Sequence, residues 1–158
     1  MDLHAQLEPL RPLIGTWRGA AFGQYPTITS FEYTEELTFT NVGKPFLAYE
    51  QRTWSLSGQA MHMETGYLRL PAPRIIEFTL AQPTGQTELA EGTMVMEGGE
   101  LILAVRGKVM NTATAKIVEA TEREYRLSGD RLATSLAMAA VGQSMTNHLS
   151  SHLIRVSD

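Results

Sequence analysis

Two histidines near the end of the chain, His148 and His152, are the residues best suited to bind a metal, because the chain has no cysteine that could compete with them. On a helix, a spacing of four residues would stack both imidazoles on one face, where they could share an ion such as zinc. On a strand they would also share a face, but at roughly 3.3 Å per residue their backbones would lie about 13 Å apart, too far to hold one small ion. A strand leaves room for one histidine as the single axial ligand of a large flat cofactor.

The residues around the two histidines favour a strand. Thr146, Ile154 and Val156 are β-branched, and the stretch has no helical stripe of apolar residues. Zinc binding also lacks an obvious third ligand. The alternative to a ligand is an ordinary strand histidine, and this stretch alone does not decide between the two.

A second chemically notable residue is Glu35, which lies in the clearest predicted strand, Phe31 to Thr40. Apolar and polar residues alternate along this strand, and Glu35 falls on the apolar face. A carboxylate that points inward needs a partner. The nearest basic residues are Arg18, Lys44 and Arg52, so we expect a buried structural ion pair in preference to a catalytic acid.

The elements that must position these residues are short strands separated by regular turn signals such as Ser57-Gly58, Pro83 to Gly85 and Gly98-Gly99. The predicted strands include residues 46–54, 61–70, 75–81, 87–91, 93–96, 101–105, 115–120, 124–127 and 132–139. Leucines at positions 3, 7, 10 and 13 predict a short N-terminal helix that plugs one end. The pattern indicates an all-β, antiparallel up-and-down barrel of about ten strands, similar to lipocalins and fatty-acid-binding proteins, with room for a ligand.

Composition narrows the class of protein further. At 158 residues, we expect residues 1–158 to form one domain. A net charge of -4 and the absence of a Lys or Arg run give no support to nucleic-acid or membrane partners. The first residues lack a signal-peptide pattern, and no stretch approaches the roughly 18 apolar residues that span a bilayer, so we expect a cytoplasmic protein.

A motif near the N-terminus makes the prediction more specific. Gly15, Trp17 and Gly19 form Gly-x-Trp-x-Gly, in which glycines let a first strand bend and the tryptophan fills the base of a barrel. The continuation resembles the nitrobindin family of small haem barrels over nearly the whole chain. The stretches that carry the resemblance are Tyr25 to Ile28, Phe31 to Glu36, Gly43 to Phe46, Gln51 to Trp54, His62 to Tyr67, Pro83 to Gly85, Met138 to Gly142 and His148-Leu149.

This resemblance implies a barrel of about ten strands that holds one b-type haem, with ferric iron bound by one histidine and the opposite face open. Nitrobindins are described as binding nitric oxide and isomerising peroxynitrite to nitrate, so the implied activity is that of a haem-dependent peroxynitrite isomerase. Without cysteine, a thiolate-ligated or covalent c-type haem is excluded, and the haem must be non-covalent. The implied partners are small molecules, and a homodimer is left open.

Position by position, the axial histidine of the family falls on His148, and His152 has no counterpart among the ligands. The haem-contacting threonine falls on Thr27, and the pocket lysine falls on Lys116, which could pair with a propionate or attract an anionic substrate. The distal positions fall on Met61 and His62. No side chain is expected to act as an acid or base, because the iron carries the reaction.

Two departures from the family pattern are visible. Ala21 occupies the last glycine position of Gly-x-Trp-x-Gly-x-Gly, where an added methyl group could crowd a porphyrin lying against that backbone. Gln143-Ser144 replaces a usual Gln-Pro, which loosens a turn but removes no ligand. Neither departure excludes haem.

A rival function is a non-catalytic carrier of fatty acids or other small apolar molecules. Barrels of this size hold such ligands, and an apolar cavity could be lined by Met61, Met63, Phe39 and Leu37. His148 separates the two functions, because a lipid carrier does not need it.

Overall fold

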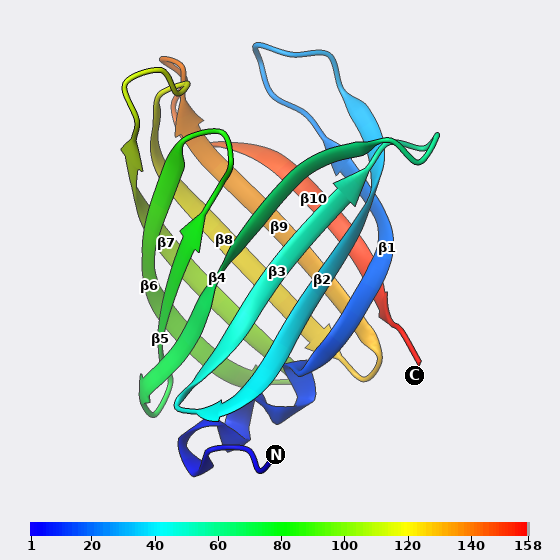
Figure 1. Cartoon of the computed structure of the whole chain (residues 1–158), viewed down its shortest axis with the longest axis vertical. Helices are drawn as coiled ribbons and strands as arrows, with labels where there is room; N and C mark the ends of the chain where they lie inside the picture. Colours follow the sequence, from blue (N-terminus) through cyan, green and yellow to red (C-terminus); the bar gives the residue numbers. More distant parts are fainter. Residues whose placement is uncertain (158) are drawn as a thin grey trace.

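The computed structural model describes residues 1–157, which form a closed antiparallel barrel of ten strands (Figure 1). The strands are β1 (Gly15–Gly23), β2 (Phe31–Lys44), β3 (Phe46–Trp54), β4 (Ala60–Ala72), β5 (Ile75–Ala81), β6 (Gln86–Glu97), β7 (Glu100–Asn111), β8 (Val118–Ser128), β9 (Arg131–Ala140) and β10 (Thr146–Arg155). Each strand pairs with its neighbours in sequence, and β1 closes the barrel by pairing with β10. The predicted fold class is confirmed.

Two pairs of predicted short strands are each one continuous strand. Residues 87–91 and 93–96 belong to β6, and residues 124–127 belong to a β8 that already begins at Val118. Gly92 links the two halves of β6 because a Cβ atom there would lie only 1.9 Å from the carbonyl oxygen of Ala104 on β7. The glycine that resembles a break in the sequence is therefore needed for close approach of two strands.

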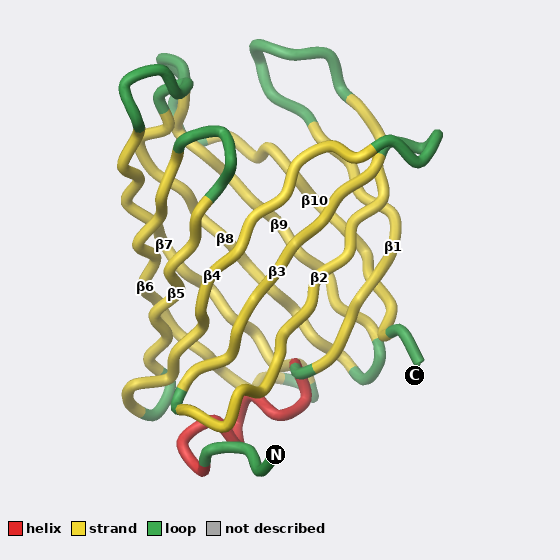
Figure 2. The backbone as a smooth tube through the Cα atoms, in the orientation of Figure 1, coloured by secondary structure: helices red, strands yellow, loops and turns green. Residues whose placement is uncertain are grey.

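The lower end of the barrel is closed by the 3₁₀ helix η1 (Ala5–Leu13), as predicted from the leucine spacing (Figures 1 and 2). Leu7, Leu10 and Leu13 are fully buried against the core. Trp17 is also fully buried, and its indole Nε1 donates a hydrogen bond of 2.9 Å to the carbonyl oxygen of Leu13. No helix within residues 1–157 is long and apolar enough to cross a membrane.

The opposite end of the barrel is where the loops β1–β2, β3–β4, β5–β6, β7–β8 and β9–β10 lie, as Figure 2 shows. We call this end the mouth. Because side chains alternate along a strand, each strand sends a series of residues inward that runs from the mouth to the plugged end. On β2 this series is Tyr33, Glu35, Leu37 and Phe39, all buried. The interior therefore changes from polar near the mouth to apolar beside η1.

Candidate functional site

A cavity of about 650 Å³ opens at the mouth, within the usual size range of small-molecule sites. Its wall includes all five residues that the family resemblance places around the haem, namely Thr27, Met61, His62, Lys116 and His148. They come from five different places in the chain, and the barrel topology brings them to one cavity. This proximity does not by itself assign their roles.

His148 lies at an irregularity in β10, where the pairing with β9 shifts between Asn147 and Leu149. A bulge of this kind re-aims a side chain that strict alternation would place on the other face. His148 therefore lines the cavity, whereas His152, four residues later, is exposed. The expectation that the two histidines share a face is wrong, and the reason is this bulge.

A backbone contact fixes the imidazole of His148. Its Nδ1 lies 2.9 Å from the carbonyl oxygen of Gln24, and because a carbonyl only accepts, Nδ1 carries the proton and donates. The Nε2 atom keeps a free lone pair. The ring of Tyr25 packs edge-on against the imidazole with centroids 5.4 Å apart. Burial lowers the pKa of His148, with the Gln24 bond opposing it, so the ring is neutral at pH 7.

Thr27 and Lys116 lie in exposed loops at the mouth. Thr27 is in the turn after β1, and Lys116 precedes β8, so the placement of Lys116 within a strand at 115–120 is wrong. The Lys116 backbone is held because its carbonyl oxygen accepts a 2.9 Å hydrogen bond from Gln86 Nε2. A threonine hydroxyl and a lysine ammonium can each bind an oxyanion at a cavity rim.

Met61 and His62 lie at the start of β4. Met61 is half exposed at 48%, and burial lowers the pKa of His62, with Glu64 opposing this effect. The apolar lining suggested for a lipid carrier is only partly present. Leu37 and Met61 line the cavity, while Met63 lies on the exposed surface and Phe39 is buried in the core beneath.

Glu35 points inward as predicted and is only 4% exposed, but the expected ion pair with a neighbouring basic residue is wrong. Its Oε1 accepts a 2.5 Å hydrogen bond from Gln51 Nε2. Arg18 and Arg52 instead reach the carboxylates of outward-facing residues on their own part of the surface, Glu36 and Glu50. Alternation explains the difference, since these arginines point outward while Glu35 points into the barrel.

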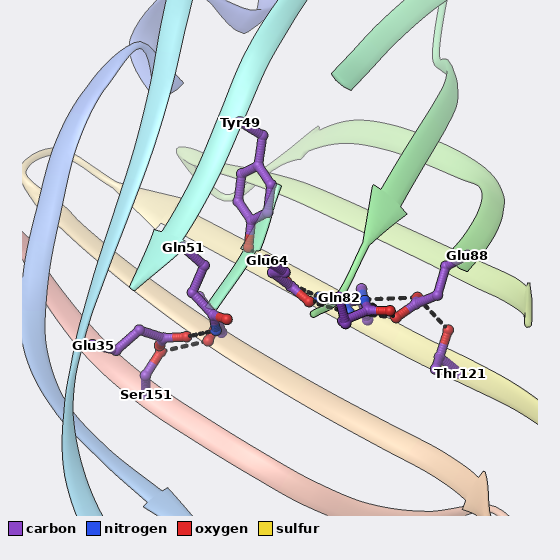
Figure 3. A network of polar contacts seen from close by, with 10 residues as sticks. Glu35, Tyr49, Gln51, Glu64, Gln82, Glu88, Thr121 and Ser151 are labelled. Atoms are coloured by element: carbon purple, nitrogen blue, oxygen red, sulfur yellow. Dashed lines mark hydrogen bonds and ion pairs between the residues drawn. The ribbon is translucent and has the colours of Figure 1, made fainter. Parts of the chain in front are cut away.

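Within residues 1–157, the buried ion pair is formed by Arg123, a residue that lies outside the strands predicted from the sequence. Its Nη1 and Nη2 donate to both oxygens of Glu64 at 2.7 and 3.0 Å, and its Nε and Nη2 donate to both oxygens of Glu88 at 3.1 and 2.6 Å. Figure 3 shows Glu64 and Glu88 within the network of polar contacts in the barrel interior. Burial raises the pKa of Glu64, but the charge and hydrogen bonds of Arg123, together with the hydrogen bond from Gln82, outweigh burial and lower the pKa to about 2.

The N-terminal motif serves packing at the seam between β1 and β10. A Cβ atom on Gly19 would lie 2.1 Å from the carbonyl oxygen of His152, so only glycine permits this strand approach. Ala21 is buried at 7% exposure but does not line the cavity. Its methyl group therefore does not crowd a ligand in that space.

The donor set favours a metal that arrives within a larger cofactor. Among residues 1–157, no group of three or more His, Cys, Asp or Glu residues could hold a bare ion. His148 nevertheless offers one neutral nitrogen at an open cavity. One imidazole ligand beside a wide, partly apolar space suits a planar cofactor whose other metal ligands are its own.

Comparison with known proteins identifies the family of this barrel. Residues 6–155 match the model of the THAP4-like, heme-binding beta-barrel domain. The chain is 49% identical to the peroxynitrite isomerase of Nocardia farcinica, over 97% of this chain and 92% of that protein. It is 47% identical to peroxynitrite isomerase 2 of Mycobacterium avium, over 98% of this chain and 97% of that protein. The crystal structure of Rv2717c from M. tuberculosis superposes with a TM-score of 0.96 at 45% identity, covering 99% of this chain and 100% of the other.

Proposed function

The chain belongs to the THAP4-like, heme-binding beta-barrel family, which confirms the nitrobindin resemblance, and from this premise we propose that it is a ferric haem b protein that isomerises peroxynitrite to nitrate. One non-covalent haem would bind at the mouth, and His148 would supply the protein's bond to its iron. The isomerase activity is the one that the names of relatives at 47% and 49% identity carry.

The observation that carries the proposal is the hydrogen bond between His148 Nδ1 and the carbonyl oxygen of Gln24. It fixes the tautomer and leaves Nε2 as the ligating atom, which is the arrangement that orients histidine ligands in metal sites. The packing of Tyr25 holds the ring, and the Tyr25 hydroxyl is itself anchored by a 3.0 Å hydrogen bond to the carbonyl oxygen of Met138. A preformed, neutral ligand suits haem iron.

When bound, ferric haem would supply a Lewis-acidic iron at which the O–O bond of peroxynitrite breaks and the N–O bond of nitrate forms. The contribution of this chain is binding and orientation. His148 would hold the cofactor from one wall, Thr27 and Lys116 would bind its propionates at the rim, and Met61 and His62 line the cavity from β4. We assign nitric oxide binding to the same open side.

The structure does not favour the rival carrier function, because the buried cation that could bind a fatty-acid carboxylate is already paired. A barrel that binds a fatty-acid carboxylate in its interior needs a cation that is free to pair with it. Arg123 is the buried guanidinium that faces the cavity, and it is already bonded to two carboxylates. A fatty acid placed beside it would meet Glu64 and Glu88.

The function is tested by stopped-flow measurement of peroxynitrite decay, with nitrate and nitrite quantified, for the ferric holoprotein, the apoprotein and His148→Ala. We expect the holoprotein to accelerate decay with nitrate as product, and the other two to do little. Equal decay with and without haem would reject the isomerase function and favour the carrier.

A further inference from the structure

Below the mouth, the barrel interior carries a layer of buried and half-buried polar side chains that the proposed haem chemistry does not use (Figure 3). We call it the carboxylate layer, and its members are Glu35, Gln51, Glu64, Gln82, Glu88 and Arg123, all of which line the cavity. Three carboxylates here face one guanidinium. Because Arg123 is bonded through both Nη atoms and Nε, its charge is fully engaged. The layer therefore has a surplus of negative charge and repels anions.

Several buried atoms of this layer have no hydrogen-bond partner among the described residues. They are Glu35 Oε2, Gln51 Oε1 and Gln82 Oε1, together with the hydroxyl of Tyr33 just above. The amide orientations are determined, because Gln51 Nε2 donates to Glu35 and Gln82 Nε2 donates to Glu64 and Glu88. Reversing either amide would set oxygen against a carboxylate. With Glu35 ionised, the free atoms are thus acceptors, apart from one hydroxyl.

Burial makes these free acceptors costly. Glu35 is 4% exposed and Gln51 is 5% exposed, and a buried polar atom without a hydrogen-bond partner destabilises the folded state. A molecule that supplies N–H donors would remove this cost. Native interiors rarely leave several such atoms in one cavity, and where they do, a bound ligand or water is the usual reason.

We propose that the carboxylate layer is a second ligand site, beneath the haem pocket, for one small ammonium-type cation such as ammonium or methylammonium. Glu35 Oε2 supplies the charged acceptor and Gln51 Oε1 a neutral one. An ammonium group carries an N–H donor for each acceptor it meets. Magnesium and calcium need about six or more oxygen ligands, and no group of three His, Cys, Asp or Glu suited to a metal occurs within residues 1–157.

Binding should be coupled to the release of a proton. Burial raises the pKa of Glu35, and the carboxylate of Glu64 raises it further. The nearby hydroxyl of Ser151, which is itself hydrogen-bonded to Thr134, opposes the increase, as do the hydrogen bond from Gln51 and the charge of Arg123. Tyr33, on the same strand, stays neutral because burial and the neighbouring Glu35 raise its pKa. The protonated form of Glu35 must lose its proton to pair with a cation. The affinity for the cation should therefore rise with pH until Glu35 is ionised in the free protein.

The test is isothermal titration of the purified protein, with and without bound haem, with methylammonium chloride at constant ionic strength. Tetramethylammonium, which has no N–H donor, and sodium serve as comparison cations. Repeating the titration in two buffers of different ionisation enthalpy counts the protons released. We expect saturable binding of one methylammonium per chain with proton release. Since a charged hydrogen bond is worth about 1.5–3 kcal/mol, Glu35→Gln should weaken binding by about tenfold or more.

Glu36→Gln is the matched control, because Glu36 neighbours Glu35 but faces outward and pairs with Arg18. It should bind methylammonium as the unmodified protein does. No saturable heat, equal heats from all three cations, or unchanged binding in Glu35→Gln would each overturn the proposal. The outcome is independent of the proposed function, since the site lies outside the haem-ligating residues and a haem spectrum of Glu35→Gln reports separately on that pocket.

Discussion

The two ends of this barrel differ in what occupies the interior. At the lower end, η1 and Trp17 fill the interior with fully buried apolar side chains. At the mouth, loops surround an open cavity, and the candidate ligand His148 is held by one backbone hydrogen bond and one aromatic contact. The carboxylate layer separates the two ends. The comparison indicates that stability resides mainly below this layer and ligand binding mainly above it, so substitutions at the two ends should affect different measurements.

The largest effect on stability is expected from Trp17→Ala at the lower end. The variant removes a fully buried indole and its hydrogen bond to Leu13, which should cost about 3–5 kcal/mol of unfolding free energy. Haem affinity per folded molecule should change little. Urea unfolding and haem titration of the same sample measure both quantities, and a large loss of haem affinity in the folded fraction would show that the two ends are not separable.

The next effect is expected from Arg123→Met in the carboxylate layer. It leaves Glu64 and Glu88 buried without their cation, and breaking such a pair costs about 3 kcal/mol at pH 7. In the unmodified protein, the lowered pKa of Glu64 means that its stabilisation is present above its ordinary pKa of 4.5 and is lost as the pH falls towards about 2.

In Arg123→Met, the sign of this pH dependence should reverse. Unpaired buried carboxylates have raised pKa values, so the folded state binds protons more tightly than the unfolded state, and stability should fall as the pH rises above about 4.5. Unfolding curves at several pH values check this. If the unfolding free energy lost in Arg123→Met is the same at every pH between 5 and 8, the ion pair does not control the protonation of the buried carboxylates.

The smallest effect is expected from Lys116→Ala at the rim. Lys116 is an exposed lysine, so its loss should leave the unfolding free energy nearly unchanged. Haem affinity, or the rate of peroxynitrite capture, should fall by about fivefold or less, and the difference should shrink as salt is added. Lys108, an exposed lysine on β7 that does not line the cavity, is the control. If Lys108→Ala has an equal effect, Lys116 acts only through its contribution to the overall charge of the protein.

Local patterns in the sequence were enough to predict the barrel, its plug and the inward direction of Glu35. These features depend on alternation and turn residues, which are local. Arg123 was missed because the predicted strands stopped at residue 120 and resumed at residue 124. Reading β8 as one strand would have placed Thr121, Arg123 and Tyr125 on the inward face. The two glutamate partners of Arg123 lie 35 and 59 residues away in the sequence, so the register of the closed barrel is needed to identify them.

The direction of His148 was also beyond local patterns. Because His148 and His152 are four residues apart, strand alternation predicts that they share a face. Only the irregular pairing of β10 with β9 turns His148 into the cavity. The family resemblance predicts His148 as the ligand without this geometry. The structure adds the physical reason that one of two similar histidines is suited to bind iron.

The most direct test of the account is a haemin titration followed at the Soret band for the unmodified protein, His148→Ala and His152→Ala. We expect His152→Ala to bind haem as the unmodified protein does, and His148→Ala to lose the ferric histidine-ligated spectrum while unfolding at nearly the same urea concentration. Added imidazole should restore that spectrum in His148→Ala by occupying the space left by the side chain. An unchanged Soret band in His148→Ala without imidazole would contradict the central claim that this histidine binds the iron.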